Sequence, residues 1–201
     1  MCYNMHRLKK GDKIMNKSLM PTVDAYVSHS IALNNAETEL MQIERQLLEA
    51  KKSRIFAYNK GESDKLRSLD ETIKSLTIKK AEQTKIFEES CRSQFYMYST
   101  YINASDVSTI GEISDLITSI DSKVNSINIE CENLEKRKAQ LFGLAKSTQD
   151  SETATKCREL SAKCHSTLVE LTMKETIYTK VKDDVTEILK KKQEEATPQM
   201  R

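Results

Sequence analysis

Apolar side chains recur along this chain at alternating steps of three and four residues, and this spacing limits its fold more than any other feature. Residues spaced in this way line one side of an α-helix and pack against a similar stripe on another helix. The longest series comprises Ile110, Ile113, Ile117, Ile120, Val124, Ile127, Cys131, Leu134, Lys138 and Leu141. Only Lys138 interrupts its apolar character. The pattern predicts long α-helices that pair lengthwise as coiled coils.

Three further segments carry the same spacing, and each predicts a helix. The first covers about residues 22–58, the second about residues 63–103, and the last follows residue 151 and ends after Leu189. The stripe of the first segment is Leu33, Ala36, Leu40, Ile43, Leu47 and Ala50. The stripe of the second begins with Leu66, Leu69, Ile73 and Leu76 and resumes at Phe87, Cys91 and Phe95. The stripe of the last is Cys157, Leu160, Cys164, Leu168, Leu171, Tyr178, Val181, Val185 and Ile188. In the second stripe, Lys80 and Gln83 fall at apolar positions. Either the stripe shifts there onto Ile78 and Ala81, or the seam is polar and fixes the register.

Few turns can separate these helices, because the 201 residues include only four glycines and two prolines. We expect turns at residues 59–63, 103–106 and 147–151, with Gly61 ending the first helix in a left-handed conformation. Ser105 or Asp106 would cap the third helix. Short connections between long helices make neighbouring helices antiparallel. The predicted fold class is all-α, either an elongated antiparallel four-helix bundle or coiled-coil hairpins with long helices.

The domain organisation follows from these helices. We expect a disordered basic leader at residues 1–20, the bundle at 21–192 and a flexible tail at 193–201. The two halves of the bundle also resemble each other, since Ile55-Phe56 corresponds to Leu141-Phe142 at an offset of 86 residues. A duplicated hairpin, with copies at 21–103 and 106–192, would explain this. Coiled-coil sequences also resemble one another by composition, and the first stripe shifted by 86 misses the third, so both interpretations stay open.

Charge and cysteine content narrow the class of protein. The net charge of +2 lacks the basic excess of a nucleic-acid binder. No apolar run approaches the length of a membrane span, and no secretory pattern is present, so we expect a soluble, cytoplasmic protein. Five scattered cysteines do not indicate a disulfide framework. Cys131, Cys157 and Cys164 fall on the stripes, where we expect them to be buried as small apolar side chains.

Motifs for catalysis, metals or cofactors are not found in the sequence. His6, His29 and His165 are the only histidines, and none lies in a Glu-x-x-His tetrapeptide of the di-iron type. The four glycines are isolated, so no phosphate-binding loop is formed. Cys157 and Cys164 lie seven residues apart, about 10.5 Å along a helix, which is too far to share one zinc ion. We therefore predict a non-enzymatic protein without catalytic, metal-binding or cofactor-binding residues.

Two groups of bulky side chains are candidate partner-binding surfaces, because aromatic residues and methionine are enriched at interfaces. The first group closes the second helix and comprises Phe95, Tyr96, Met97, Tyr98 and Tyr101. The second comprises Phe56, Tyr58 and Phe142, which an antiparallel bundle would gather at its opposite end. The alternative is that both groups are core residues that seal the ends of the bundle.

Basic residues cluster near the second group, namely Lys51, Lys52, Arg54, Lys136 and Arg137. They could contact an acidic partner or anionic lipid headgroups. Alternatively, they are solvated helix faces, since Glu49 and Glu135 lie close by in sequence.

The predicted function is that of a coiled-coil or helical-bundle interaction protein, acting as scaffold, spacer or adaptor through its helix faces and tips. Its partners would be proteins, and the stripes would also permit a homo-oligomer. The alternative is a membrane-associated, BAR-like helical module in vesicle trafficking. A nucleic-acid-associated helical protein is the third and least favoured function, because the charge is nearly balanced. The sequence identifies neither the partner nor the pathway.

Overall fold

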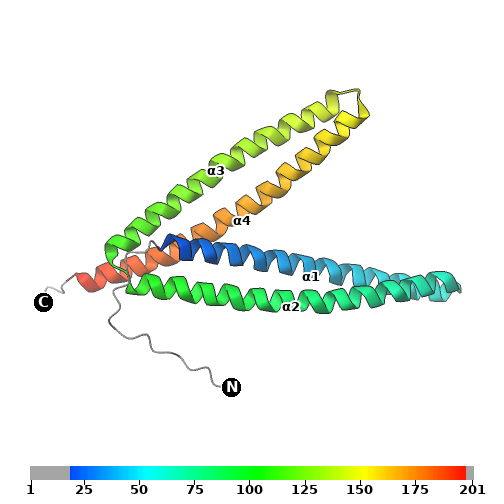
Figure 1. Cartoon of the computed structure of the whole chain (residues 1–201), viewed down its shortest axis with the longest axis horizontal. Helices are drawn as coiled ribbons and strands as arrows, with labels where there is room; N and C mark the ends of the chain where they lie inside the picture. Colours follow the sequence, from blue (N-terminus) through cyan, green and yellow to red (C-terminus); the bar gives the residue numbers. More distant parts are fainter. Residues whose placement is uncertain (1–18, 198–201) are drawn as a thin grey trace, which may run out of the picture.

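The computed structural model describes residues 19–197, and it is all-α as predicted (Figure 1). Its helices are α1 (Met20–Lys60), α2 (Ser63–Val107), α3 (Ile110–Ser147) and α4 (Ser151–Ala196). No strand occurs within residues 19–197. At about 1.5 Å per residue, even the shortest helix, the 38-residue α3, is about 57 Å long. The expected leader and the end of the expected tail, residues 1–18 and 198–201, lie outside the described residues.

Two of the three connections lie where the sequence placed them. Gly61 adopts φ 73° and ends α1, as expected, and its N–H donates to the Tyr58 carbonyl oxygen at 3.1 Å. The Glu62 N–H donates to the Ala57 carbonyl at 3.1 Å, which completes a Schellman-type cap. Asp150 caps α4, since its side chain accepts from the N–H groups of Glu152 and Thr153.

The second connection lies later than predicted. α2 continues through residues 103–106 to Val107, because the hydroxyls of Ser105 and Ser108 donate back to carbonyls four residues earlier and do not cap a new helix. Thr109 is the cap of α3, and it forms a reciprocal capping box with Glu112. The hydrogen bonds to Thr109 hold the pKa of the Glu112 carboxyl below its usual range.

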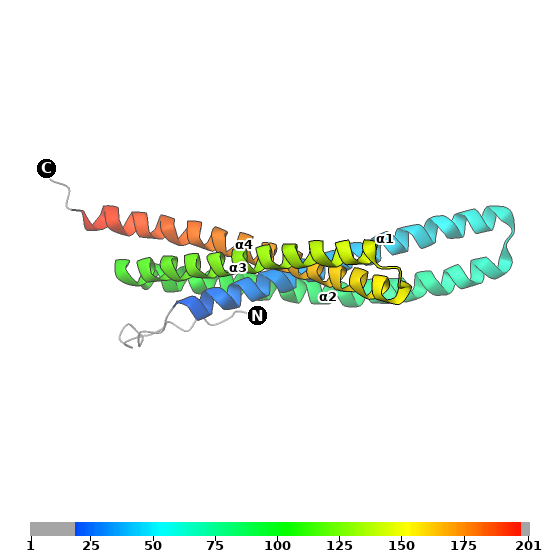
Figure 2. The ribbon, with the colours of Figure 1, turned by 90° about the horizontal axis from the view of Figure 1, so that it is seen from above.

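The helices form two antiparallel coiled-coil arms, α1 with α2 and α3 with α4, that diverge from one shared end as a V (Figure 1). In the view turned by 90°, the two arms overlap over much of their length (Figure 2). The start of α1, the end of α2, the start of α3 and the end of α4 meet at the shared end. We call the buried cluster there the junction. The predicted class of helical hairpins is thus confirmed, while a core common to all four helices is confined to the junction.

The seam of the α1–α2 arm is polar in its middle, which decides between the two sequence alternatives. Gln83 is 7% exposed, and its Nε2 donates to the Ala36 carbonyl oxygen at 3.2 Å. Lys80 Nζ lies 2.7 Å from a carboxylate oxygen of Glu44 on α1. Ile78, the apolar alternative, is 53% exposed. The stripe therefore continues through Lys80 and Gln83 without a shift.

The α3–α4 arm follows most of its predicted stripe, and the exceptions are Ile110, which is 36% exposed in the first turn of α3, and Leu160. Cys157 and Cys164 are buried in the seam, as expected. Leu160 was also placed on the stripe, but it is 41% exposed and Ser161 is buried in its place. With Ser161 the buried positions from Cys157 to Leu171 alternate in steps of four, three, four and three, whereas Leu160 would give three, four, four and three, so the regular alternation overrides the greater hydrophobicity of leucine.

Candidate functional site

The junction holds the largest buried apolar cluster of the described residues. Its members come from all four helices and are Val23, Tyr26, Val27, Tyr101, Ile113, Leu116, Ile120, Ile127, Leu171, Tyr178, Val181 and Val185. Val23, Ile113, Ile120, Val181 and Val185 are fully buried. Apolar burial is the main term that favours association, so this cluster is what joins the two arms.

Two tyrosine–aspartate hydrogen bonds connect the arms at the junction. The Tyr101 hydroxyl on α2 donates to Asp184 Oδ2 on α4 at 2.6 Å, and the Tyr178 hydroxyl on α4 donates to Asp24 Oδ1 on α1 at 2.6 Å. Burial, with the neighbouring carboxylate second, raises the pKa of both tyrosines well above the usual value. Both therefore remain neutral donors at physiological pH. Such directional bonds fix how α4 sits against the other arm.

Further polar contacts surround the junction. Lys123 Nζ on α3 lies 3.7 Å from the second oxygen of Asp24, and Lys182 Nζ on α4 donates to Asp121 on α3 at 2.6 Å. Lys192 Nζ donates to the Asp106 carbonyl oxygen at 2.5 Å, which ties the end of α4 to the end of α2. These partners lie 61–99 residues apart in the chain, and no local sequence signal identifies them.

The predicted aromatic group on α2 divides between core and surface. Tyr101 is 1% exposed, and Tyr98 and Met97 pack against the junction core. The rings of Tyr26, Tyr98 and Tyr101 pack with centroids 5.0–5.8 Å apart. Phe95 and Tyr96 are 70% and 65% exposed. Successive residues turn by about 100° around a helix, so only one side of this group can face the core.

The α1–α2 arm ends in a tip, residues 51–72, that carries exposed bulky side chains. Ile55, Phe56 and Tyr58 are each more than half exposed. Lys60 Nζ lies 4.4 Å from the centroid of the Phe56 ring, which is a cation–π contact across one helical turn.

The predicted basic residues lie on the same tip. Lys51, Lys52 and Arg54 are exposed. Lys52 pairs with Glu49 at 3.6 Å, and Arg54 pairs with Asp70 across the arm. The Asp70 hydrogen bond raises the pKa of Arg54.

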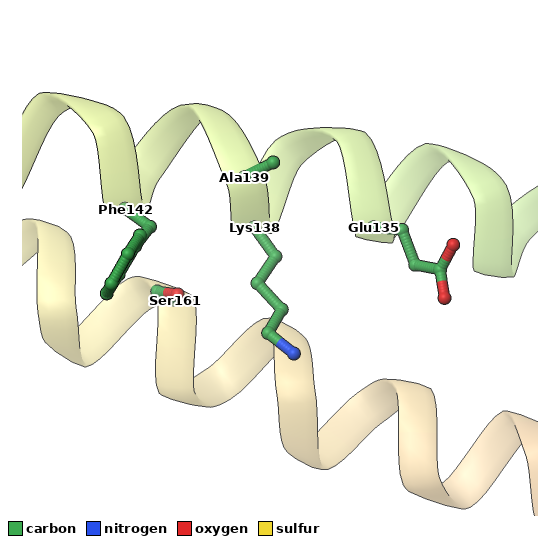
Figure 3. A pocket seen from close by; sticks show the side chains of 5 residues that line it. All are labelled: Glu135, Lys138, Ala139, Phe142 and Ser161. Carbon is green, nitrogen blue, oxygen red and sulfur yellow. The ribbon is translucent and has the colours of Figure 1, made fainter.

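The α3–α4 arm ends in a second tip, residues 136–160, of similar chemistry. Phe142 and Leu144 are more than half exposed, and Lys146 Nζ lies 4.4 Å from the Phe142 ring centroid. Lys136 and Arg137 are exposed on the preceding turns. Phe142 also lines an open groove of about 420 Å³ with Glu135, Lys138, Ala139 and Ser161, in which Phe142 and Lys138 extend toward α4 (Figure 3).

The two tips do not meet, which corrects one prediction. The sequence placed Phe56, Tyr58 and Phe142 together at one end of a continuous bundle. In the structure Phe56 and Tyr58 lie at the end of one arm and Phe142 at the end of the other, and the arms diverge (Figure 1). Outside the junction, packing runs within each hairpin, α1 with α2 and α3 with α4, and the buried cluster shared by all four helices does not extend to the tips.

Groups suited to metal binding do not converge within the described part of the chain. No cluster of three or more His, Cys, Asp or Glu side chains there could hold a metal ion. His165 Nδ1 lies 3.4 Å from Lys138 Nζ, on the surface of the α3–α4 arm. Burial, together with Glu175, Glu130 and Glu135, raises the pKa of the Cys131 thiol. Across residues 19–197, no helix combines the length and apolar character that crossing a membrane requires.

The chain matches no protein-family model, no curated protein and no solved structure.

Proposed function

We propose that this protein is a non-enzymatic, two-armed scaffold that holds two binding tips apart at an angle set by the junction. The single observation that carries this proposal is that two long arms diverge from one junction (Figure 1), where two tyrosine–aspartate hydrogen bonds connect them. A chain that needed only a stable core would gain by burying both arms against each other.

Exposed side chains at the arm ends support binding through the tips. Phe56, Tyr58, Phe142 and Leu144 are each more than half exposed. Aromatic side chains supply much of the binding energy at interfaces, and here they remain in solvent at the points farthest from the junction. A BAR-like crescent is the less favoured function, because its curved face requires helices packed along their whole length, and these arms separate.

Site-specific photo-crosslinking tests this proposal. A photoreactive side chain is placed at Tyr58 or Leu144 on the tips, and at Ile86 or Ile129 on the arms as matched exposed controls. We expect covalent products with cellular partners from the tip positions and few from the arm positions. Equal labelling along the arms would show that the helix faces, and not the tips, carry the interaction.

A further inference from the structure

The two tips present the same chemistry in the same arrangement. At each tip a phenylalanine is more than half exposed, and a lysine four residues later lies 4.4 Å from its ring centroid. The pairs are Phe56 with Lys60 and Phe142 with Lys146, and 86 residues separate the equivalent positions. The arms thus end in two matched surfaces.

Charge separates the tips from the remainder of the described chain. From residue 51 to the end of α1, and from residue 136 to the end of α3, each segment contains four basic and no acidic residues. The α1–α2 tip as a whole has six basic and four acidic residues, and the α3–α4 tip has six and three. The remaining described residues include 14 basic and 22 acidic side chains. Both tips are therefore positive, and the arms and junction are negative.

The geometry points to the two tips as matched docking ends for one anionic lipid surface. In this arrangement the exposed Phe56 and Phe142 rings enter the interfacial layer, and the neighbouring lysines and arginines contact lipid phosphates. This inference rests on the proposal that the tips are the binding ends, and it names their partner.

The local contacts suit a bilayer surface. The ammonium groups of Lys60 and Lys146 lie over the Phe56 and Phe142 rings, so each tip presents an exposed apolar ring and a positive charge side by side, the two groups that a side chain needs at a membrane interface. A bilayer also presents the same chemistry at two separated points whatever the distance between them. A protein partner would need two acidic sites matched to the spacing of the tips. The negative arms and junction would be repelled from the anionic surface, so the chain would stand on its tips.

Vesicle co-sedimentation of the full chain tests this inference, using phosphatidylcholine vesicles with and without phosphatidylserine. One variant changes the α1–α2 tip, Phe56→Ser with Lys51→Glu, and another changes the α3–α4 tip, Phe142→Ser with Arg137→Glu. A third variant combines all four changes. The control, Ile86→Ser with Lys85→Glu, makes the same chemical change at exposed positions in the middle of α2.

We expect the original chain and the control to bind phosphatidylserine vesicles and to be released at high salt. Each single-tip variant should bind about 10- to 100-fold more weakly, because loss of one contact removes the gain from two linked contacts. The combined variant should not bind.

Two results would overturn the inference: no salt-sensitive binding by the original chain, or full binding by the combined variant. Loss caused by one tip alone would contradict the matched roles. Tip-specific crosslinks to proteins without vesicle binding would overturn the lipid inference and leave the scaffold proposal standing.

Discussion

The hydrogen bond between Tyr101 and Asp184 offers the sharpest test of how the arms are joined. Replacing Tyr101 with phenylalanine keeps the ring that packs against Tyr26 and Tyr98, and removes only the hydroxyl that donates to Asp184 at 2.6 Å. Tyr101 is 1% exposed, so its hydroxyl has left water to make this bond. The substitution therefore isolates one contact between the arms.

The expected cost follows from the type of bond. A hydrogen bond to a charged group contributes about 1.5–3 kcal/mol, and removing one partner leaves the other without its donor. Asp184 is half-buried, so water can partly replace the hydroxyl and the loss should fall at the lower end. We expect Tyr101→Phe to lower the free energy of unfolding of the junction by about 1–2 kcal/mol.

Urea denaturation followed by near-ultraviolet circular dichroism measures this loss. The chain has no tryptophan, and three of its seven tyrosines pack together at the junction, so the aromatic signal reports on the junction more than on the arms. Tyr58→Phe is the matched control, since it removes a hydroxyl at a position that is 70% exposed. Its effect should stay within about 0.5 kcal/mol.

A double-mutant cycle with Asp184→Asn separates the bond from other effects of the two changes. The coupling energy between the substitutions should be about 1 kcal/mol. If Tyr101→Phe costs no more than Tyr58→Phe, or if the coupling is zero, the bond does not fix the two arms and the reasoning about the junction is refuted.

Three other predictions follow from the described contacts. Gln83→Leu should raise the free energy of unfolding by about 0.5–2 kcal/mol in urea denaturation, because it replaces a polar seam residue, and a decrease would show that the polar seam stabilises the arm. Cys131 should be alkylated more slowly in the folded chain than in the urea-unfolded chain at neutral pH, as followed by peptide mass spectrometry. The difference should shrink as pH rises because more Cys131 thiolate forms in the folded chain, and equal rates at neutral pH would contradict its raised pKa. Tyr101 and Tyr178 should ionise only on unfolding, and stability should fall above about pH 10, where unfolded tyrosines ionise and these two do not. Ultraviolet titration of tyrosinate checks this, and smooth ionisation of all seven tyrosines without unfolding would contradict it.

Much of each arm was predictable because coiled-coil packing is a local, repeated property. Leu47 and Ala50 on α1 and Cys157 and Cys164 on α4 are buried where the spacing placed them. The exceptions are positions where regular spacing and hydrophobicity disagree, as at Ser161, or where a seam residue is polar, as at Gln83. The turn after α2 was misplaced because Ser105 resembles a cap in sequence, while its hydroxyl donates within the helix.

The candidate sites were only partly predictable. Sequence identified the residues of both tips, but placed Phe56 and Phe142 together when they lie at the ends of different arms. It also treated Phe95, Tyr96 and Tyr101 as one group, which the junction divides into exposed and buried members. The roles of Asp24 and Asp184 had no sequence signal, because each bonds to a tyrosine on the opposite arm, 83 or more residues away.

The sequence by itself determined four long helices and their pairing in two hairpins, since three- and four-residue spacing and short turns act between neighbouring segments. The tertiary structure alone decided that the hairpins diverge. The hairpins meet through a few buried side chains that lie far apart in the chain, among them Val23, Ile113 and Val181. A periodic pattern predicts that a residue faces another helix, but it does not specify which helix that is. Apolar side chains of all four helices are buried against one another only at the junction, whereas along the arms packing runs within each hairpin and side chains such as Met41, Ile86 and Ile129 stay in solvent.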